Sequence, residues 1–331
     1  MAALTLQLRW RRFALQLPRP LHTSRQRLSI RQGWLLQLIT ADGSVGWGEA
    51  APLAADAELE SSMAAIAAAI EALGPSPNRR HLEAGLAQQR WPASLAFALG
   101  AALAEADGLI GAAAGGWLPA PEAAVLLPAG EAALPALTAA LVAAADGPGP
   151  VFKWKVAVHD DAAERQLLEQ LLLQLPAAAR LRLDANGRWP RATAWAWADR
   201  LAAEPRLQWL EQPLAPDDHA GLEALARRVP VALDESLVAR PALRGSWSGW
   251  QVRRPSQEGD PRPLLAALQT GCGQVVLSTA FETGIGRRWV HHLAALQAQG
   301  PTPVAPGLAL AWQPQGAWAN SEPQVVWEAA A

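Results

Sequence analysis

The chain has 331 residues, of which 51% are hydrophobic and 18% charged, and its formal net charge is −2. This composition is typical of a globular protein rather than a disordered chain, and the near-neutral charge argues against a general nucleic-acid surface. Its alanine-rich runs are too short or too often charged to cross a bilayer. The single cysteine, Cys272, excludes an intramolecular disulfide and fits a reducing compartment. We therefore expect a cytoplasmic protein that binds neither nucleic acid nor membrane.

The first part of the chain predicts an α+β domain. Residues 33–40 form an apolar strand pattern, Asp42-Gly43 is a strong hairpin turn signal, and residues 45–49 return as a second strand. Two alanine-rich helical stretches follow, near 57–73 and 93–109. We assign residues 1–115 to this domain.

Residues 116–304 alternate between strand and helix patterns, which favours parallel β/α units closed into a barrel. Strands are expected at 124–127, 151–157, 180–184, 207–211, 230–234, 250–254 and 274–278. Helical patterns fill most gaps, for example 161–175, 191–203 and 218–228. The last stretch, 305–331, is rich in Pro and Trp, fits no further unit, and is expected to pack on the first domain.

Three acidic residues, Asp184, Glu211 and Asp234, end successive strand patterns of this barrel. The carboxyl ends of parallel barrel strands meet at one mouth, where active sites lie. Three carboxylates would repel one another there unless a cation lay between them, and oxygen ligands suit Mg²⁺. Each residue alone is more readily explained as a helix N-cap or a surface charge. Their shared phase on three successive strands favours the metal site.

A pair of lysines lies one strand earlier. Lys153 and Lys155 share a face because side chains alternate along a strand. Two ammonium groups on one face repel, which lowers the pKa of at least one, and a lysine that is partly neutral can act as a general base. The alternative is a solvated charge pair on an edge strand. Beside Mg²⁺, such a base suits removal of a proton alpha to a carboxylate, so we expect a small-molecule carboxylate substrate.

These residues fall in motifs that resemble a known family. Lys153-Trp154-Lys155, Asp184-Ala185-Asn186, Glu211-Gln212-Pro213 and Asp234-Glu235-Ser236 match the muconate-lactonizing branch of the enolase superfamily. Further segments resemble the o-succinylbenzoate synthase family within it, namely residues 25–28, 46–53, 181–186, 277–286 and 306–308. The likeness runs from about 25 to 310. It implies a (β/α)7β modified TIM barrel with an N-terminal α+β capping domain.

The resemblance also implies a function: a Mg²⁺-dependent lyase that dehydrates 2-succinyl-6-hydroxy-2,4-cyclohexadiene-1-carboxylate to o-succinylbenzoate, in menaquinone or phylloquinone biosynthesis. It implies that Lys155 is the base and then the acid, and that Lys153 tunes Lys155 and holds the anion. The remaining implied roles are Mg²⁺ binding by Asp184, Glu211 and Asp234, substrate contact by Ser278 and Thr279, and support by Asn186 and Arg182. The alternatives are another cycloisomerase acting on a carboxylate, or a barrel that binds a carboxylate without turnover.

One position departs from the family pattern. Where the family usually has lysine before the proline of the sixth strand, this chain has Arg254 before Pro255. Arginine stays protonated and is a poor second base, which argues against racemase or epimerase activity. As a cation, Arg254 can still stabilise a flat dienolate; the alternative is that it only pairs with Asp234 or Glu235. Its neighbour Arg253 should face the helix layer, where the sequence offers no reason for a charge.

Overall fold

The computed structural model describes residues 6–22, 27–54, 56–143 and 149–330. Arg25 and Gln26, part of the first family-like segment, lie outside these ranges. The first domain contains an antiparallel sheet of β1 (Gln7–His22), β2 (Arg27–Ile39) and β3 (Val45–Ala50), in that order. The turn expected at Asp42-Gly43 is confirmed: Gly43 N donates to Thr40 O at 3.0 Å, with a glycine φ of 87°.

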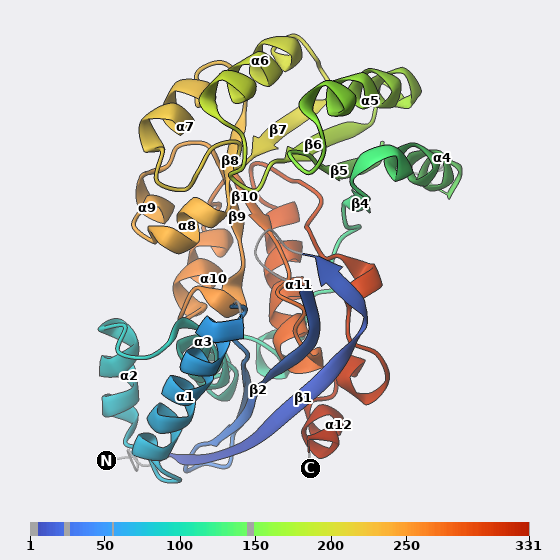
Figure 1. Ribbon diagram of the computed structural model, residues 1–331. Helices are drawn as coiled ribbons and strands as arrows, with labels where there is room; N and C mark the ends of the chain where they lie inside the picture. The colour runs from blue at the N-terminus through green and yellow to red at the C-terminus, as the bar shows by residue number, and fades with distance from the viewer. Residues whose placement is uncertain (1–5, 23–26, 55, 144–148, 331) are drawn as a thin grey trace.

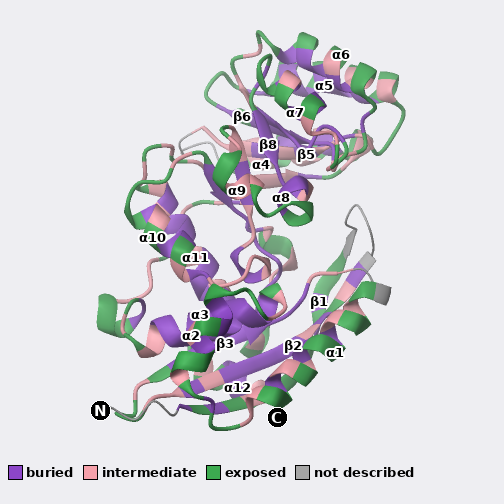
Figure 2. Ribbon diagram, turned by 90° about the vertical axis from the view of Figure 1, so that its left-hand side faces the viewer, coloured by how far each residue is buried: buried purple, intermediate pink, exposed green. Residues whose placement is uncertain are grey.

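Three helices pack on this sheet: α1 (Asp56–Leu73), α2 (Arg79–Ala87) and α3 (Ala93–Ala106). Helix α3 is buried along most of its length and lies between the sheet and the second domain (Figures 1 and 2). It can approach β3 closely because the strand carries glycines. A Cβ at Gly46 would lie 1.8 Å from Ala102 O, and one at Gly48 would lie 2.1 Å from Ala98 O.

The second domain is built on a curled sheet of seven parallel strands in the order β10-β9-β8-β7-β6-β5-β4. Their bounds are β4 (Val125–Leu127), β5 (Val151–Lys155), β6 (Arg180–Asp184), β7 (Leu207–Glu211), β8 (Val231–Leu233), β9 (Trp250–Arg253) and β10 (Val275–Leu277). All seven lie inside the ranges expected from the sequence. The helices of this domain are α4 (Ala133–Ala143), α5 (Asp161–Gln174), α6 (Arg191–Leu201), α7 (His219–Ala226), α8 (Glu235–Ala239), α9 (Leu243–Ser246), α10 (Arg262–Gln269) and α11 (Gly284–Ala298).

A short segment near Pro306 joins the two ends of this sheet. Gly307 forms a parallel bridge with Ser278, directly after β10, and Pro306 O accepts a hydrogen bond from Ala124 N, directly before β4, at 2.9 Å. This segment supplies the last strand position of a (β/α)7β barrel. The expected fold class, an α+β domain on an enolase-type barrel, is confirmed.

The end of the chain lies against the first domain. Helix α12 (Pro323–Ala329) packs beside β1 (Figure 1), and Arg11 NH1 donates to Trp327 O at 2.9 Å. Trp327 also meets Trp47 of β3, with ring centroids 5.5 Å apart. The division of the chain at residues 115 and 304 stays a prediction. Within the described ranges, no helix combines the length and the hydropathy needed to span a membrane.

Candidate functional site

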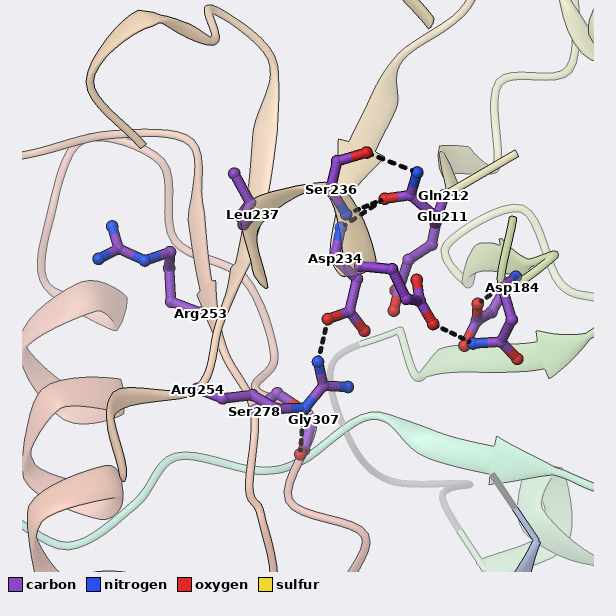
Figure 3. A network of polar contacts seen from close by, with 12 residues as sticks. Asp184, Glu211, Gln212, Asp234, Ser236, Leu237, Arg253, Arg254, Ser278 and Gly307 are labelled. Carbon is purple, nitrogen blue, oxygen red and sulfur yellow. Dashed lines mark hydrogen bonds and ion pairs between the residues drawn. The ribbon is translucent and has the colours of Figure 1, made fainter. Parts of the chain in front are cut away.

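Three acidic residues meet at the carboxyl ends of neighbouring strands. Asp184 ends β6, Glu211 ends β7 and Asp234 directly follows β8. The register pairs Asp184 with Glu211, so the two side chains start from the same level of the sheet. All three are at most 3% exposed, and Figure 3 shows them converging. Asp234 occupies the N-cap position of α8 but makes no side-chain capping bond, so the N-cap alternative does not explain it.

Three cationic side chains oppose these carboxylates. Lys153 Nζ donates to Glu211 Oε1 at 2.5 Å and lies 2.9 Å from Asp184 Oδ2. Lys155 Nζ lies 3.6 Å from the same Asp184 oxygen, and Arg254 forms an ion pair with Asp234 (Figure 3). Strand β5 lies between β4 and β6, so the lysine pair is not on a sheet edge. The alternative of a solvated edge pair is therefore wrong.

The charges set the pKa values of this cluster. Burial alone would lower the pKa of Lys153, but the carboxylates of Asp184, Glu211 and Asp234 together raise it above its ordinary value. The lowered pKa that the sequence predicts for at least one lysine is therefore not found at Lys153. Burial would raise the pKa of Asp184, yet the two lysines lower it to about 2. The pKa of Glu211 is raised, chiefly by burial.

Cationic side chains contact each of these acids in the structure. Among the described residues, no three His, Cys, Asp or Glu side chains stand close enough together to form a ready-made metal cluster. The Lys153 ammonium contacts both Asp184 and Glu211, while Arg254 pairs with Asp234. The donors are nevertheless carboxylate oxygens on three adjacent strand ends. Beside them, Glu235 Oε2 is buried without a hydrogen-bond partner within the described ranges. This donor set fits a hard divalent cation such as Mg²⁺.

Gln212 joins the ends of β7 and β8 beneath the site. Its Oε1 accepts from Asp234 N at 3.1 Å and from Ser236 N at 3.0 Å, and its Nε2 donates to Ser236 Oγ at 2.7 Å (Figure 3). Its backbone φ is 37°, a strained value for a residue other than glycine. Gln212 therefore fixes the backbone of Asp234. The sequence alone does not indicate this role, because a glutamine after a strand has no distinctive signal.

Asn186 connects Lys155 to a further carboxylate. Its Oδ1 accepts from Lys155 Nζ at 2.8 Å, and its Nδ2 donates to Glu235 Oε1 at 3.1 Å. Its own N–H donates to Asp184 Oδ1 at 3.1 Å. Asn186 therefore contacts both the lysine and a carboxylate of the cluster, and it orients the lysine ammonium.

Arg182 lies inside the barrel rather than at the carboxylates. Its guanidinium stacks on the Trp209 ring at 4.1 Å and donates to Gln208 Oε1 and to Ala305 O, at 2.6 and 2.8 Å. Burial lowers its pKa to about 9. These contacts tie β6 and β7 to the segment that closes the barrel.

The neighbouring arginines point in opposite directions (Figure 3). Arg254 points to Asp234, whereas Arg253 pairs with Glu258 at 2.6 Å on the other side of β9. Glu258 also accepts from Arg254 N at 2.7 Å. Glu258 thus neutralises the charge of Arg253, for which the sequence offered no reason. The same carboxylate fixes the backbone of Arg254.

Ser278 and Thr279 follow β10, which pairs with β9. Ser278 N donates to Arg253 O at 2.8 Å, and Ser278 Oγ donates to Gly307 O at 3.3 Å. Thr279 Oγ1 donates to Glu282 Oε2 at 2.6 Å. Both residues are at most 9% exposed. Substrate contact by these hydroxyl groups stays a prediction.

The fold and the site together define an enolase-type barrel. A curled parallel sheet lies under an antiparallel α+β domain, and acids on three adjacent strand ends lie opposite two lysines. The family model described as "Enolase C-terminal domain-like" matches residues 136–245. The o-succinylbenzoate synthase of Yersinia enterocolitica is 30% identical over 274 residues, covering 76% of this chain and 79% of that protein. The chain thus belongs to the enolase superfamily and, within it, to the o-succinylbenzoate synthase family.

Two further comparisons agree. The o-succinylbenzoate synthase of Thermosynechococcus vestitus is 40% identical over 153 residues, 43% of this chain and 47% of that protein, so this match spans about half of the relative. The crystal structure of o-succinylbenzoate synthase from Thermosynechococcus elongatus, complexed with Mg in its active site, is similar with a TM-score of 0.78. It is 28% identical and covers 98% of this chain and 99% of that one. The muconate lactonizing enzyme from Pseudomonas fluorescens, 20% identical with a TM-score of 0.67 over 90% of this chain and 85% of that one, shares the fold.

Proposed function

We propose that the protein is a Mg²⁺-dependent carbon–oxygen lyase of the cytoplasm. It converts 2-succinyl-6-hydroxy-2,4-cyclohexadiene-1-carboxylate to o-succinylbenzoate, a step towards menaquinone or phylloquinone. The observation that carries this proposal is that Lys155 lies 3.6 Å from Asp184, one of three buried carboxylates at adjacent strand ends, in a chain related to o-succinylbenzoate synthases. Asp184, Glu211 and Asp234 would hold the metal ion. When bound, Mg²⁺ supplies positive charge that stabilises the negative charge developing on the substrate carboxylate.

Lys155 is the proposed base and acid. Its ammonium lies at the cluster, held by Asn186 at 2.8 Å, and its side chain is 25% exposed, so substrate can reach it. In its neutral form it takes the proton alpha to the ring carboxylate. It then gives that proton to the hydroxyl group as the carbon–oxygen bond breaks, so that water leaves and the ring becomes aromatic.

Lys153 and Arg254 act as fixed cations in this proposal. Lys153 stays protonated because the carboxylates raise its pKa, so it holds negative charge rather than moving a proton. Arg254 pairs with Asp234, as one sequence-based alternative expected, and its pKa is raised chiefly because this carboxylate outweighs the effect of burial. A permanently charged guanidinium stabilises an anion but cannot remove a proton from it. With Lys155 as the one base and Arg254 as a fixed cation, the site fits a dehydration that needs a single lysine better than a racemization that needs two bases.

The test is an ultraviolet assay with purified protein and the cyclohexadiene carboxylate. We expect loss of the diene absorbance with Mg²⁺ and no loss with a chelator. A folded, Mg²⁺-loaded protein that leaves the diene unchanged would refute this substrate. Turnover of muconate or a related carboxylate would then identify a cycloisomerase, and failure with every carboxylate would identify a binding protein without turnover.

A further inference from the structure

A second cluster of buried polar residues joins the capping domain to the loop after β10. It consists of Arg31 from β2, Glu49 from β3, and Glu282 and Thr283 from the loop that leads into α11. Each of the four is at most 2% exposed. None of them takes part in the chemistry proposed above. Burying charged groups between two domains is costly unless their hydrogen bonds are well made, so the arrangement needs a reason.

Glu49 makes its hydrogen bonds across the domain boundary. Its Oε2 accepts from Thr283 N at 2.9 Å, from Thr283 Oγ1 at 2.5 Å and from Gly286 N at 3.1 Å. Thr283 is the N-cap residue of α11 and Gly286 lies in its first turn, where backbone N–H groups lack helical partners and negative charge is favoured. A Cβ at residue 286 would lie 2.9 Å from Glu49 Oε2, so glycine leaves the space for this contact. A side chain of one domain therefore caps a helix of the other.

The capped helix directly follows the loop that carries Thr279. Within this loop, Glu282 accepts from Thr279 Oγ1 at 2.6 Å and from Ala280 N at 2.9 Å. Glu282 also accepts from Ser256 Oγ at 2.5 Å, two residues after Arg254. Phe281 has a φ of 65°, which a bulky residue adopts only when its surroundings enforce it. The loop conformation thus depends on contacts at both of its ends.

We propose that Glu49 is a positioning residue for the reaction. By capping α11 from the capping domain, it holds residues 279–283 in their strained form and so places the hydroxyl groups of Ser278 and Thr279 for substrate. The docking of the capping domain is thereby coupled to substrate binding. This inference rests on the proposed function for its kinetic consequence, but not for its structural one.

Glu105 provides a matched control. It also lies on the capping domain, in α3, and also contacts α11: its Oε2 accepts from Arg288 NH2 at 2.6 Å and from Trp47 N at 2.9 Å. Its contact is further along the helix and involves no residue of the loop 279–283. Glu49→Ala, Glu49→Gln and Glu105→Gln therefore separate positioning of the loop from simple docking of the domains.

Hydrogen exchange of the peptide 278–286 and steady-state kinetics are measured on all four proteins. Glu49→Ala leaves the buried donors Thr283 N, Thr283 Oγ1 and Gly286 N without this acceptor, so it should speed exchange and raise KM by about tenfold or more, with a smaller change in kcat. Glu49→Gln keeps an acceptor oxygen and should show a smaller change in the same direction. Glu105→Gln should leave both quantities within about twofold of wild type, since its contact lies outside the loop.

Four outcomes decide whether Glu49 positions the loop. Unchanged exchange in both Glu49 variants would overturn the proposal, as would equal effects on KM in the Glu49 and Glu105 variants. If Glu49→Ala does not fold, Glu49→Gln decides by the same two measurements. If wild type fails to turn over the cyclohexadiene carboxylate, the proposed function fails on its own, and the exchange rates alone decide whether Glu49 positions the loop.

Discussion

Replacing Arg254 tests whether this arginine serves the site or merely the fold. The Asp234 side chain is 3% exposed and the Arg254 side chain 24% exposed, so Arg254→Met leaves a buried carboxylate without its partner. Breaking a fully buried ion pair costs about 3–5 kcal/mol. Because the guanidinium is partly in contact with solvent, we expect a smaller loss of about 2–3 kcal/mol in the free energy of unfolding. Arg254→Lys keeps the charge and should lose only about 1 kcal/mol.

Mg²⁺ should change how much stability Arg254→Met loses. With chelator present, Arg254→Met should show its full loss of stability in urea unfolding. With saturating Mg²⁺ the loss should shrink, because the ion supplies the positive charge that Asp234 has lost. For turnover, Arg254→Lys should stay within about tenfold of wild type, whereas Arg254→Met should lose about a hundredfold if the cation stabilises the dienolate.

Arg253→Met is the matched control, since Arg253 is the adjacent residue of the same type and pairs with Glu258, whose side chain is 10% exposed. Because Glu258 keeps a second partner, Arg244 Nε at 3.6 Å, this variant should lose less stability than Arg254→Met, equally with Mg²⁺ and with chelator, and it should retain turnover. The reasoning is refuted if Arg254→Met is as stable as wild type, or if its loss of stability is the same with and without Mg²⁺. An inactive Arg254→Lys would show that the planar guanidinium, and not its charge alone, is required.

Three further predictions concern other residues. Lys155→Ala should lower kcat by about 10³–10⁴-fold with an unchanged circular dichroism spectrum, and activity within tenfold of wild type would contradict its role as base. Asp184→Asn should weaken Mg²⁺ binding by about a hundredfold or more in calorimetry, and unchanged affinity would exclude Asp184 as a ligand. Burial raises the pKa of Glu49 from 4.5 to about 7. The hydrogen bonds from Thr283 and the charge of Arg31 lower this pKa, and the charge of Glu282 raises it, but burial has the largest effect. The contribution of Glu49 to stability is therefore full below about pH 4.5 and is lost as the pH rises through 7. As the pH rises from 5 to 8, the free energy of unfolding of Glu49→Gln, measured in urea, should rise by roughly 2–3 kcal/mol relative to that of wild type. Parallel pH profiles of the two proteins would show that Glu49 does not titrate in this range.

Local sequence patterns were sufficient to predict the seven barrel strands and the position of the three acids at strand ends. Strand alternation and the spacing of β/α units are properties of short segments, so the seven strands and the strand-end positions of Asp184, Glu211 and Asp234 followed from the sequence. The helix α2 was not predicted, because its nine residues carry no acidic first turn and no basic last turn. The turn at Gly43 was predicted, because its signal lies in two adjacent residues.

The pairing of side chains was decided only by the closed barrel and the docked domain. Nothing in the local sequence says that Arg254 turns to Asp234 while Arg253 turns to Glu258, or that Lys153 contacts two carboxylates. The contact between Glu49 and Thr283 joins residues 234 positions apart in the chain. Such contacts depend on how sheet, loop and capping domain come together, because a side chain takes its charge partner from whatever the tertiary structure places within reach. The sequence thus determined which chemical groups lie at the barrel mouth, and the tertiary structure decided which of them touch.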